Sequence, residues 1–230
     1  MRILALDTAT PALTLAVLED DRVLAESNQF PGRTHSRVLV PEMDRGLRVL
    51  DLTPADLDLI AVGIGPGSFT GLRIGLAAAK GLAWAAAKPL IGVPTLDALA
   101  RAVAPEPGWI CPLLNARRGQ VFAALYRPGP KGNWERQTEY GAFSAADLAV
   151  LVREKTMFFG EGVRTAGREL SARLGPLYLR GPEENDFPRA TQTARVAREL
   201  YLAGAETDPG LVVPLYIRPP DIREPKERAK

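Results

Sequence analysis

The order of hydrophobic and polar positions predicts an α/β protein that begins with three strands. A short apolar run, 2–7, ends in the carboxylate of Asp7, and a second segment carries apolar residues at every second position. A polar turn then leads into a third run with strand character. Strands are therefore predicted over 2–7, 13–17 and 23–27.

Helical periodicity begins near residue 34 and runs to residue 50. Its apolar positions, which share one face, are Leu39, Met43, Leu47 and Leu50. Pro41 is expected to kink this helix or to mark its true start, because proline removes a backbone hydrogen bond. Strands and helices then alternate, with strands over 58–63 and 90–93 and helices over 70–87 and 95–103. Strands followed by such alternation are typical of an α/β plan.

Residues 105–108 (PEPG) are the best candidate for a domain boundary. Beyond them strands again come first, over 109–114, 120–126, 134–140 and 156–160, with helices over 144–153, 165–174 and 191–203. We therefore expect an N-terminal domain, 1–104, a C-terminal domain, 105–218, and a mobile tail, 219–230, rich in proline and charge. The helix 191–203 is a candidate to pack back on the first domain.

The segment 65–75 (GPGSFTGLRIG) is the most informative motif, because glycines gather where a strand must turn into a helix. Gly65 and Gly67 allow positive φ, and Ser68 or Thr70 is a natural helix N-cap. A helix N-terminus can bind phosphate. The spacing fits neither a Walker A loop nor a G-x-G-x-x-G loop, since Arg73 stands where a Walker A loop needs its hydroxyl residue. A tight turn with a helix start is the favoured interpretation.

Within the helix 70–87, three small residues lie four apart and share one face: Gly71, Gly75 and Ala79. Glycine inside a helix costs about 1 kcal/mol relative to alanine, so a compensating contact is expected. Close approach of another helix is the usual reason. The sequence leaves open whether that helix belongs to this chain or to another.

Composition narrows the class of protein further. The 230 residues are 46% hydrophobic and 24% charged, with a net charge of only +2 and scattered basic residues, so no nucleic-acid stripe is evident. Cys111 is the single cysteine, which excludes disulfide frameworks and cysteine-based metal sites, and it is expected to be a small core residue. The apolar stretch 75–87 is too short to span a bilayer, and no signal peptide is evident. We expect a cytoplasmic protein.

Six segments carry a resemblance to a known family. They are 3–10 (ILALDTAT), 33–41 (RTHSRVLVP), 65–75, 92–96 (GVPTL), 115–117 (NAR) and 214–218 (PLYIR). The chain resembles the TsaB (YeaZ) family, the small subunit of the bacterial system that makes N6-threonylcarbamoyladenosine on tRNA. The resemblance is dense up to about residue 126 and thin from there to residue 210. It implies two actin-like (ASKHA, ribonuclease H-like) α/β domains, each a mixed sheet flanked by helices.

The resemblance also implies partners. The larger, catalytic paralogue TsaD is expected to pair with this chain through the helices 34–50 and 70–87, and the ATPase subunit TsaE to join them. Pairing of this chain with itself, and indirect contact with tRNA through the complex, are further expectations. The residues expected to bind the partner are His35, Leu39, Met43, Gly71, Arg73, Gly75 and Ala79. A bulky residue at Gly75 is then expected to block pairing and leave the monomer folded.

A catalytic role for this chain itself is not expected. The large paralogue binds a metal through two histidines at i and i+4, and the matching positions here are Thr95 and Leu99. We therefore assign no catalytic residue and no metal ligand. Asn115 and Gln120 stand where relatives commonly carry acidic residues, which the sequence does not explain.

The first strand keeps part of a nucleotide site. Actin-like ATPases end this strand with Asp and a glycine-containing hairpin, whereas this chain keeps Asp7, Thr8 and Thr10 without the glycine. These three are the candidate nucleotide-binding residues. No intrinsic cofactor is expected, and ATP or ADP with Mg²⁺ at the subunit interface remains a candidate.

The favoured function is a non-catalytic subunit that binds and activates TsaD in modifying position 37 of tRNAs that read ANN codons. One alternative is a stand-alone actin-like ATPase or sugar kinase that uses Asp7. Another is a metallopeptidase-like protein, although no H-E-x-x-H motif or histidine pair is present. Arg73, Arg117 and Arg118 could each reach a phosphate or a partner's carboxylate, or do neither.

Overall fold

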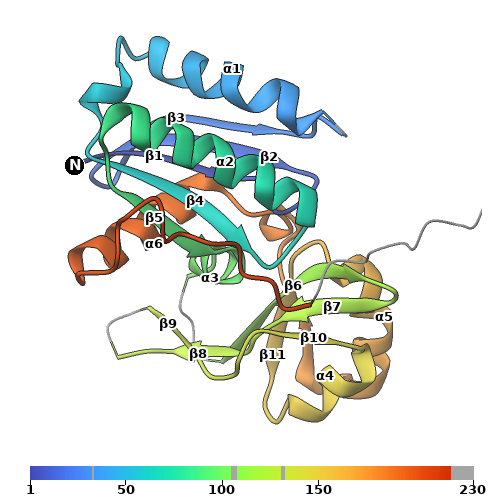
Figure 1. The fold of residues 1–230 in the computed structure, drawn as a ribbon. Coiled ribbons are helices and arrows are strands. Elements are labelled where there is room, and N and C mark those ends of the chain that lie inside the picture. Colours follow the sequence, from blue (N-terminus) through green and yellow to red (C-terminus); the bar gives the residue numbers. More distant parts are fainter. Residues whose placement is uncertain (33, 105–107, 131–132, 219–230) are drawn as a thin grey trace, which may run out of the picture.

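A computed structural model describes residues 1–32, 34–104, 108–130 and 133–218 (Figure 1). Most of the predicted domain boundary, 105–107, and the predicted tail, 219–230, lie outside the described residues. The described chain forms two sheets, each with helices packed on it. The chain therefore has the α/β architecture that the sequence pattern predicts.

The first sheet contains five strands in the order β3-β2-β1-β4-β5. Its strands are β1 (Arg2–Asp7), β2 (Leu13–Glu19), β3 (Arg22–Gln29), β4 (Leu59–Gly65) and β5 (Leu90–Pro94). The strands β1, β2 and β3 pair antiparallel, whereas β4 pairs parallel with both β1 and β5. The carboxyl ends of β1, β4 and β5 therefore meet at one edge of the sheet, where the glycine segment begins.

Helices cover both faces of this sheet. The helices α1 (His35–Arg48) and α2 (Phe69–Ala86) lie side by side on one face and share a core with β1, β2 and β4. The helix α6 (Ala190–Leu202) packs on the other face, beside α3 (Thr95–Arg101). A short 3₁₀ turn, Pro54–Asp56, precedes β4. The last helix of the chain thus covers the first sheet.

The second sheet begins with β6 (Trp109–Arg117), and its main path runs β10-β7-β6-β11-β12. Its other strands are β7 (Gln120–Ala123), β8 (Tyr126–Pro128), β9 (Trp134–Arg136), β10 (Gly141–Phe143), β11 (Thr156–Phe159) and β12 (Tyr178–Arg180). The helices α4 (Ala145–Leu151) and α5 (Val163–Leu174) pack on one face. The helix α3 covers the other face, so it lies between the two sheets.

An extended segment, 203–218, which we call the C-terminal strap, returns from α6 along the first sheet. Leu90 N–H donates to the Thr207 carbonyl at 3.0 Å, and Leu215 N–H donates to the Ile64 carbonyl at 2.8 Å. At its end, Arg218 donates to the Ala116 carbonyl on β6 at 2.5 Å. The strap therefore connects the first sheet to the second.

The predicted elements agree with the structure in kind, with local differences. Pro41 lies inside α1 and does not mark its start, and the Pro41 side chain is exposed to solvent. The predicted strand 120–126 is divided into β7 and β8, and the strand predicted over 134–140 ends at Arg136. Cys111 lies fully buried in β6, which confirms its prediction as a core residue.

Candidate functional site

The glycine segment connects β4 to α2 as a tight turn. Gly65 has φ +101°, a value that side chains disfavour, and a Cβ at Gly67 would lie 2.3 Å from the Ala9 carbonyl oxygen. Ser68 is the N-cap of α2, because its Oγ accepts the Gly71 N–H at 3.2 Å. The predicted turn with a capped helix is confirmed, with Ser68 rather than Thr70 as the cap.

Asp7 lies at the end of β1 and is completely buried. Its carboxylate accepts the Ala9 N–H at 2.7 Å and the Thr95 hydroxyl at 2.9 Å. Burial raises the pKa of Asp7 from 3.8 to about 6, and the two hydrogen bonds only partly oppose that effect. A Cβ at Gly63 would lie 1.9 Å from Oδ2, so the β4 backbone closes over the carboxylate.

The other two candidate nucleotide-binding residues are also buried and bonded within the chain. Thr8 donates its hydroxyl to the Gly71 carbonyl at 2.8 Å, and Thr10 Oγ1 accepts the Ala12 N–H at 3.2 Å. The structure thus places Asp7, Thr8 and Thr10 at one end of β1 as the sequence predicts. Their polar atoms are buried and bonded within the chain, and their role in nucleotide binding stays a prediction.

The small-residue face of α2 is directed inward. A Cβ at Gly71 would lie 2.1 Å from the Thr8 carbonyl oxygen, and one at Gly75 would lie 2.2 Å from Thr8 Oγ1. Ala79, on the same face, is completely buried. The compensating contact for these glycines is therefore the end of β1 in the same chain. The assignment of Gly71, Gly75 and Ala79 to partner binding is corrected accordingly.

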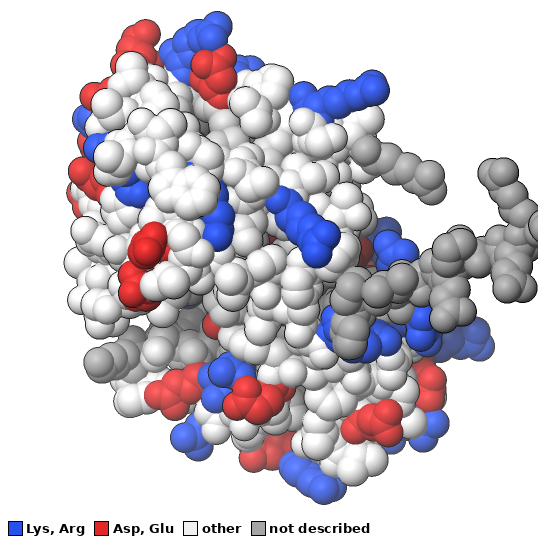
Figure 2. Space-filling model, in the orientation of Figure 1, with Lys and Arg blue, Asp and Glu red and all other residues white. Residues whose placement is uncertain are grey.

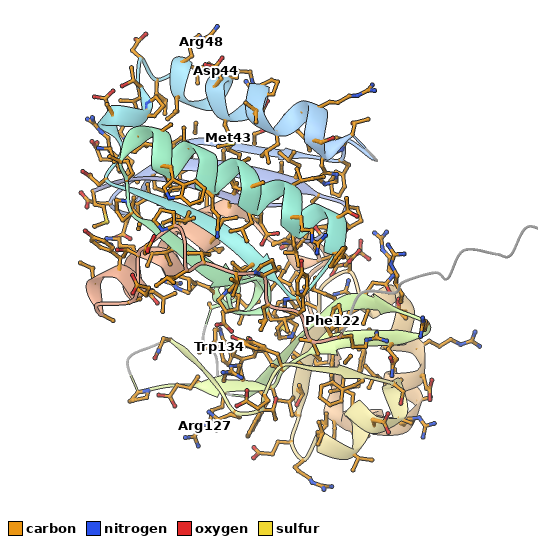
Figure 3. All side chains as sticks on the ribbon, viewed as in Figure 1. Met43, Asp44, Arg48, Phe122, Arg127 and Trp134 are labelled. Carbon is orange, nitrogen blue, oxygen red and sulfur yellow. The ribbon has the colours of Figure 1, made fainter. Side chains whose placement is uncertain are left out.

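The predicted partner-binding residues of α1 are buried as well. Leu39 and Met43 are 1% and 5% exposed and belong to the core beneath α1. His35, the first residue of α1, is buried with its Nε2 lacking a hydrogen-bond partner in the described chain. Figure 3 shows Met43 beneath α1, with Asp44 and Arg48 on its outer side. The assignments of Leu39 and Met43 are also corrected, because the apolar stripe of an amphipathic helix covers its own sheet first, whereas the assignment of His35 stays a prediction.

The outer surface of α2 carries a second row of small residues. This row consists of three exposed residues four positions apart: Ala77, Gly81 and Ala85. Arg73 stands one turn before them on the same face, and Trp84 beside them is 62% exposed. A Cβ at Gly81 would have no atom within 4 Å. On the neighbouring α1, Val40 is 58% exposed. The sequence analysis did not single out this outer row, although its four-residue spacing is visible in the sequence.

Of the seven predicted partner-binding residues, Arg73 alone lies exposed at the surface. Its guanidinium lies 3.8 Å above the Phe69 ring, and its Nε donates to the Tyr216 hydroxyl at 3.1 Å. The Phe69 and Tyr216 rings lie 5.2 Å apart. These contacts fix the position of Arg73 where the start of α2 meets the C-terminal strap.

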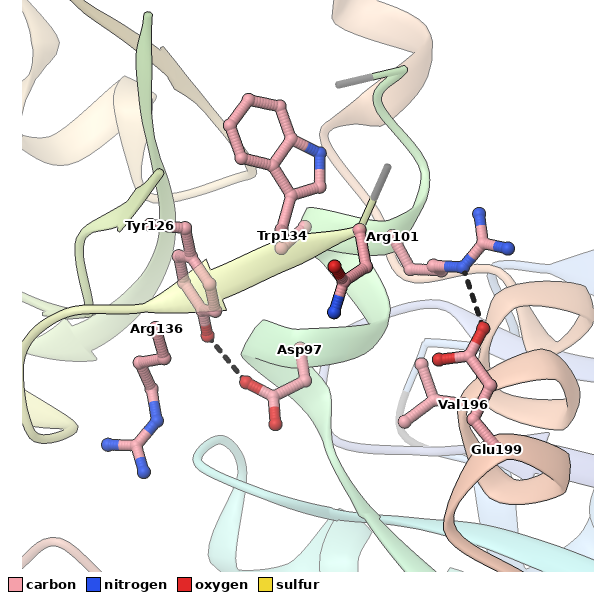
Figure 4. A pocket seen from close by; sticks show the side chains of 9 residues that line it. Asp97, Arg101, Tyr126, Trp134, Arg136, Val196 and Glu199 are labelled. Carbon is pink, nitrogen blue, oxygen red and sulfur yellow. Dashed lines mark hydrogen bonds and ion pairs between the residues drawn. The ribbon is translucent and has the colours of Figure 1, made fainter. Parts of the chain in front are cut away.

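Two cavities are described, and neither is lined by Asp7, Thr8 or Thr10. The first, of about 200 Å³, lies between α3, α6 and the β8–β9 hairpin (Figure 4). There Asp97 accepts the Tyr126 hydroxyl at 2.6 Å, and Arg101 is ion-paired with Glu199 at 3.3 Å. The second, of about 470 Å³, is lined mainly by apolar residues around Trp109. The polar groups of the first cavity thus bond mainly to one another.

Thr95 and Leu99, which match the metal-binding histidines of the larger paralogue, make contacts inside the fold. Thr95 donates to Asp7, and Leu99 is buried in the core between α3 and the second sheet. No cluster of three or more His, Cys, Asp or Glu side chains suited to a metal ion occurs among the described residues. Asn115 has a structural role, since its Oδ1 accepts the Arg117 N–H at 2.7 Å in the β6–β7 turn.

Two mixed sheets flanked by helices, with α3 between them, define the two-domain actin-like (ASKHA) fold. A solved structure of YeaZ from Pseudomonas aeruginosa shares it, with a TM-score of 0.80 and 25% identity over 94% of this chain and 99% of that chain. The TsaB protein of Bacillus subtilis is 34% identical over 221 residues, which cover 95% of this chain and 94% of that protein. The chain therefore belongs to the TsaB (YeaZ) family.

Two further comparisons agree with this family. The TsaB protein of Escherichia coli is 39% identical over 136 residues, covering 58% of each protein. Both of these TsaB relatives are described as tRNA threonylcarbamoyladenosine biosynthesis proteins. Residues 28–133 match the family described as TsaD, tRNA N6-adenosine threonylcarbamoyltransferase. Among the described helices, none combines the length and hydrophobicity needed to cross a membrane.

Proposed function

We propose that this chain takes part in forming N6-threonylcarbamoyladenosine on tRNA as a non-catalytic subunit. In this proposal it binds and activates a larger TsaD-type paralogue that modifies position 37 of tRNAs reading ANN codons. The TsaE ATPase is the further partner, tRNA is reached through the complex, and the chain acts in the cytoplasm. Membership of the TsaB family supports the pathway.

The observation that carries the partner-binding role is Gly81. This glycine lies in the middle of an 18-residue helix, is exposed, and has no atom of the described residues outside its own helix backbone within 4 Å of its Cβ position. Glycine there costs about 1 kcal/mol relative to alanine, and no contact among the described residues explains it. With Ala77 and Ala85 it forms a smooth exposed strip beside Trp84. Such a strip lets the backbone of a second helix approach closely.

We therefore place the partner-binding surface on the outer faces of α1 and α2. Val40, Ala77, Gly81 and Trp84 form its apolar part, and Arg73 marks one end. The same surface suits a second copy of this chain when the larger paralogue is absent. The buried and bonded state of Asp7 and Thr8 supports the non-catalytic role. If ATP or ADP with Mg²⁺ takes part, the interface with the partner is its proposed location.

The test is to substitute Gly81→Leu and measure pairing with TsaD from the same organism by size-exclusion chromatography. Leucine has open space at this position and a better helix propensity than glycine, so the free chain should remain folded. The larger side chain should keep the two helices apart and weaken pairing about 100-fold, since overfilling a packed contact costs up to about 3 kcal/mol. Formation of the tRNA modification should fall in parallel.

Thr165→Leu is the matched control, because it places the same side chain on an exposed position of α5. Pairing and modification should be unchanged in this variant. Normal pairing of the Gly81→Leu chain would refute the proposed surface. Modification by the Thr165→Leu or wild-type chain without TsaD would refute the non-catalytic role.

A further inference from the structure

We propose that a band of arginines across the junction of the two domains binds the phosphate backbone of an RNA. The band consists of Arg73 on α2, Arg117 in the β6–β7 turn, Arg164 on α5 and Arg218 on the C-terminal strap. We call these four residues the arginine band. They are distant in the sequence, and the fold brings them together.

A chain of contacts links three members of the band: Arg73, Arg218 and Arg117. Arg73 donates to Tyr216, which lies two residues before Arg218 in the extended strap. Arg218 donates to the Ala116 carbonyl at 2.5 Å, and the next residue of β6 is Arg117. Arg73, Arg218 and Arg117 are therefore linked through the C-terminal strap and the end of β6.

Arg164 extends the band over the second domain. The Asn115 N–H donates to the carboxylate of Glu161, and Arg164 lies close enough to act on the same carboxylate electrostatically. Burial raises the pKa of Glu161 above its ordinary value, and the neighbouring Arg164 opposes that shift. The other nearby acid, Asp186, is buried and ion-paired with Arg180 at 2.7 Å.

The β6–β7 turn supplies an independent indication of function. Arg117 and Arg118 have φ values of +61° and +51°, and Gly119 follows at +73°. Consecutive left-handed positions in a hairpin turn favour Asn and Gly, and other residues there are strained. Arginines at both positions are therefore the costlier choice for the turn itself. A requirement for positive charge at this tip explains why they stand there.

The surroundings favour RNA over an acidic protein. Figure 2 shows Lys and Arg side chains gathered on the right of the molecule, at the level of the β6–β7 turn and α5. Among the described residues, Arg73 and Arg218 bond to neutral oxygens, and Glu161 is the acid that lies near Arg164. Phe69 and Tyr216 add aromatic rings beside Arg73, and guanidinium groups with aromatic rings suit phosphates and unpaired bases. The choice of RNA also rests on the proposed function.

The test uses a fluorescently labelled tRNA transcript and the isolated chain, with binding followed by anisotropy between 50 and 300 mM KCl, a range of about a factor of six. The test variant is R117Q/R164Q, which removes two band charges. The control is R22Q/R153Q, which removes two exposed charges: Arg22 begins β3 and Arg153 follows α4, at the ends of the two sheets opposite to the arginine band. Each phosphate contact contributes about fivefold at 0.1 M salt, so the test variant should bind about 25-fold more weakly.

The salt dependence should change with the affinity. The slope of log K against log salt should become shallower by about 1.4 in R117Q/R164Q and remain unchanged in R22Q/R153Q. Equal losses in both variants would show that only net charge matters and would overturn the proposal. Binding by R117Q/R164Q equal to that of the wild type would also overturn it.

Pairing of each variant with TsaD is measured in parallel, so that the two proposals fail separately. Loss of RNA binding with normal pairing supports the arginine band. Loss of pairing with normal RNA binding would show that the band is a protein contact, which overturns the RNA proposal. Failure of Gly81→Leu to weaken pairing leaves the RNA measurement on the isolated chain unaffected.

Discussion

Replacing Asp7 with asparagine should stabilise this protein at neutral pH. Asp7 is completely buried, and its only hydrogen-bond donors among the described residues are the Ala9 N–H and the Thr95 hydroxyl. Among the residues that the structure describes, no cation contacts the carboxylate, so its ionisation is costly in the folded chain. Asparagine has nearly the same shape and keeps one acceptor for Ala9. The Thr95 hydroxyl can rotate to accept from the asparagine amide.

The magnitude follows from the pKa of Asp7, which burial raises from 3.8 to about 6. At about 1.4 kcal/mol per pKa unit, the ionised carboxylate destabilises the folded chain by about 3 kcal/mol above pH 6. Between pH 3.8 and 6 the folded chain binds more protons than the unfolded chain, so this contribution to stability falls as pH rises. Below pH 3.8 both states are protonated and the penalty disappears.

The assay is urea unfolding of the wild type and Asp7→Asn between pH 4 and 8. The difference in free energy of unfolding should be small at pH 4 and should favour the variant by about 3 kcal/mol at pH 7, or roughly 6–12 °C in Tm. Thr95→Val removes one donor and should destabilise more at pH 7 than at pH 4. A difference between Asp7→Asn and the wild type that does not change with pH would refute the reasoning.

Two further outcomes follow from buried contacts. Gly75→Leu should destabilise the chain by at least about 3 kcal/mol, because a Cβ there meets Thr8 Oγ1 at 2.2 Å. Thermal melting measures this loss. A folded Gly75→Leu monomer that no longer pairs would instead support the prediction that Gly75 binds the partner. Cys111 should resist a thiol reagent in the native protein, because complete burial shields its thiol and raises the pKa of the thiol. It should react after the chain is unfolded in urea. Rapid reaction of the native protein would contradict the buried position of Cys111.

The sequence was sufficient to predict the elements and the fold class. Periodicity placed α1, α2 and α6 within two residues of their observed starts, because each has one strongly apolar face. Strand ends in the second domain were predicted less well. The predicted strand 120–126 is interrupted between β7, which pairs with β6 and β10, and β8, which pairs with β6 and β9. Pairing partners of this kind depend on distant residues and leave no local signal.

The candidate site was predicted less accurately than the fold. The helix α2 carries two rows of small residues, one through Gly71 and Gly75 and one through Ala77 and Gly81. Both have four-residue spacing, and the sequence alone does not say which row covers the sheet. The exposed Trp84 beside Gly81 identifies the outer row once the structure is known. Arg73 and Arg117 were each considered as possible phosphate contacts, but their grouping with Arg164 and Arg218 was not predicted, because the four residues come from separate elements.

The position of α6 affects how this protein can be made. One face of the first sheet, with Ile3, Ala5 and Ile91, is covered by α6, which begins only at Ala190. The ribosome must therefore synthesise the whole second domain before this apolar face is covered. Domains usually fold as units during synthesis, but here the first domain must wait. Premature termination before residue 190 would release a fragment with an open apolar sheet, a target for chaperones and proteases.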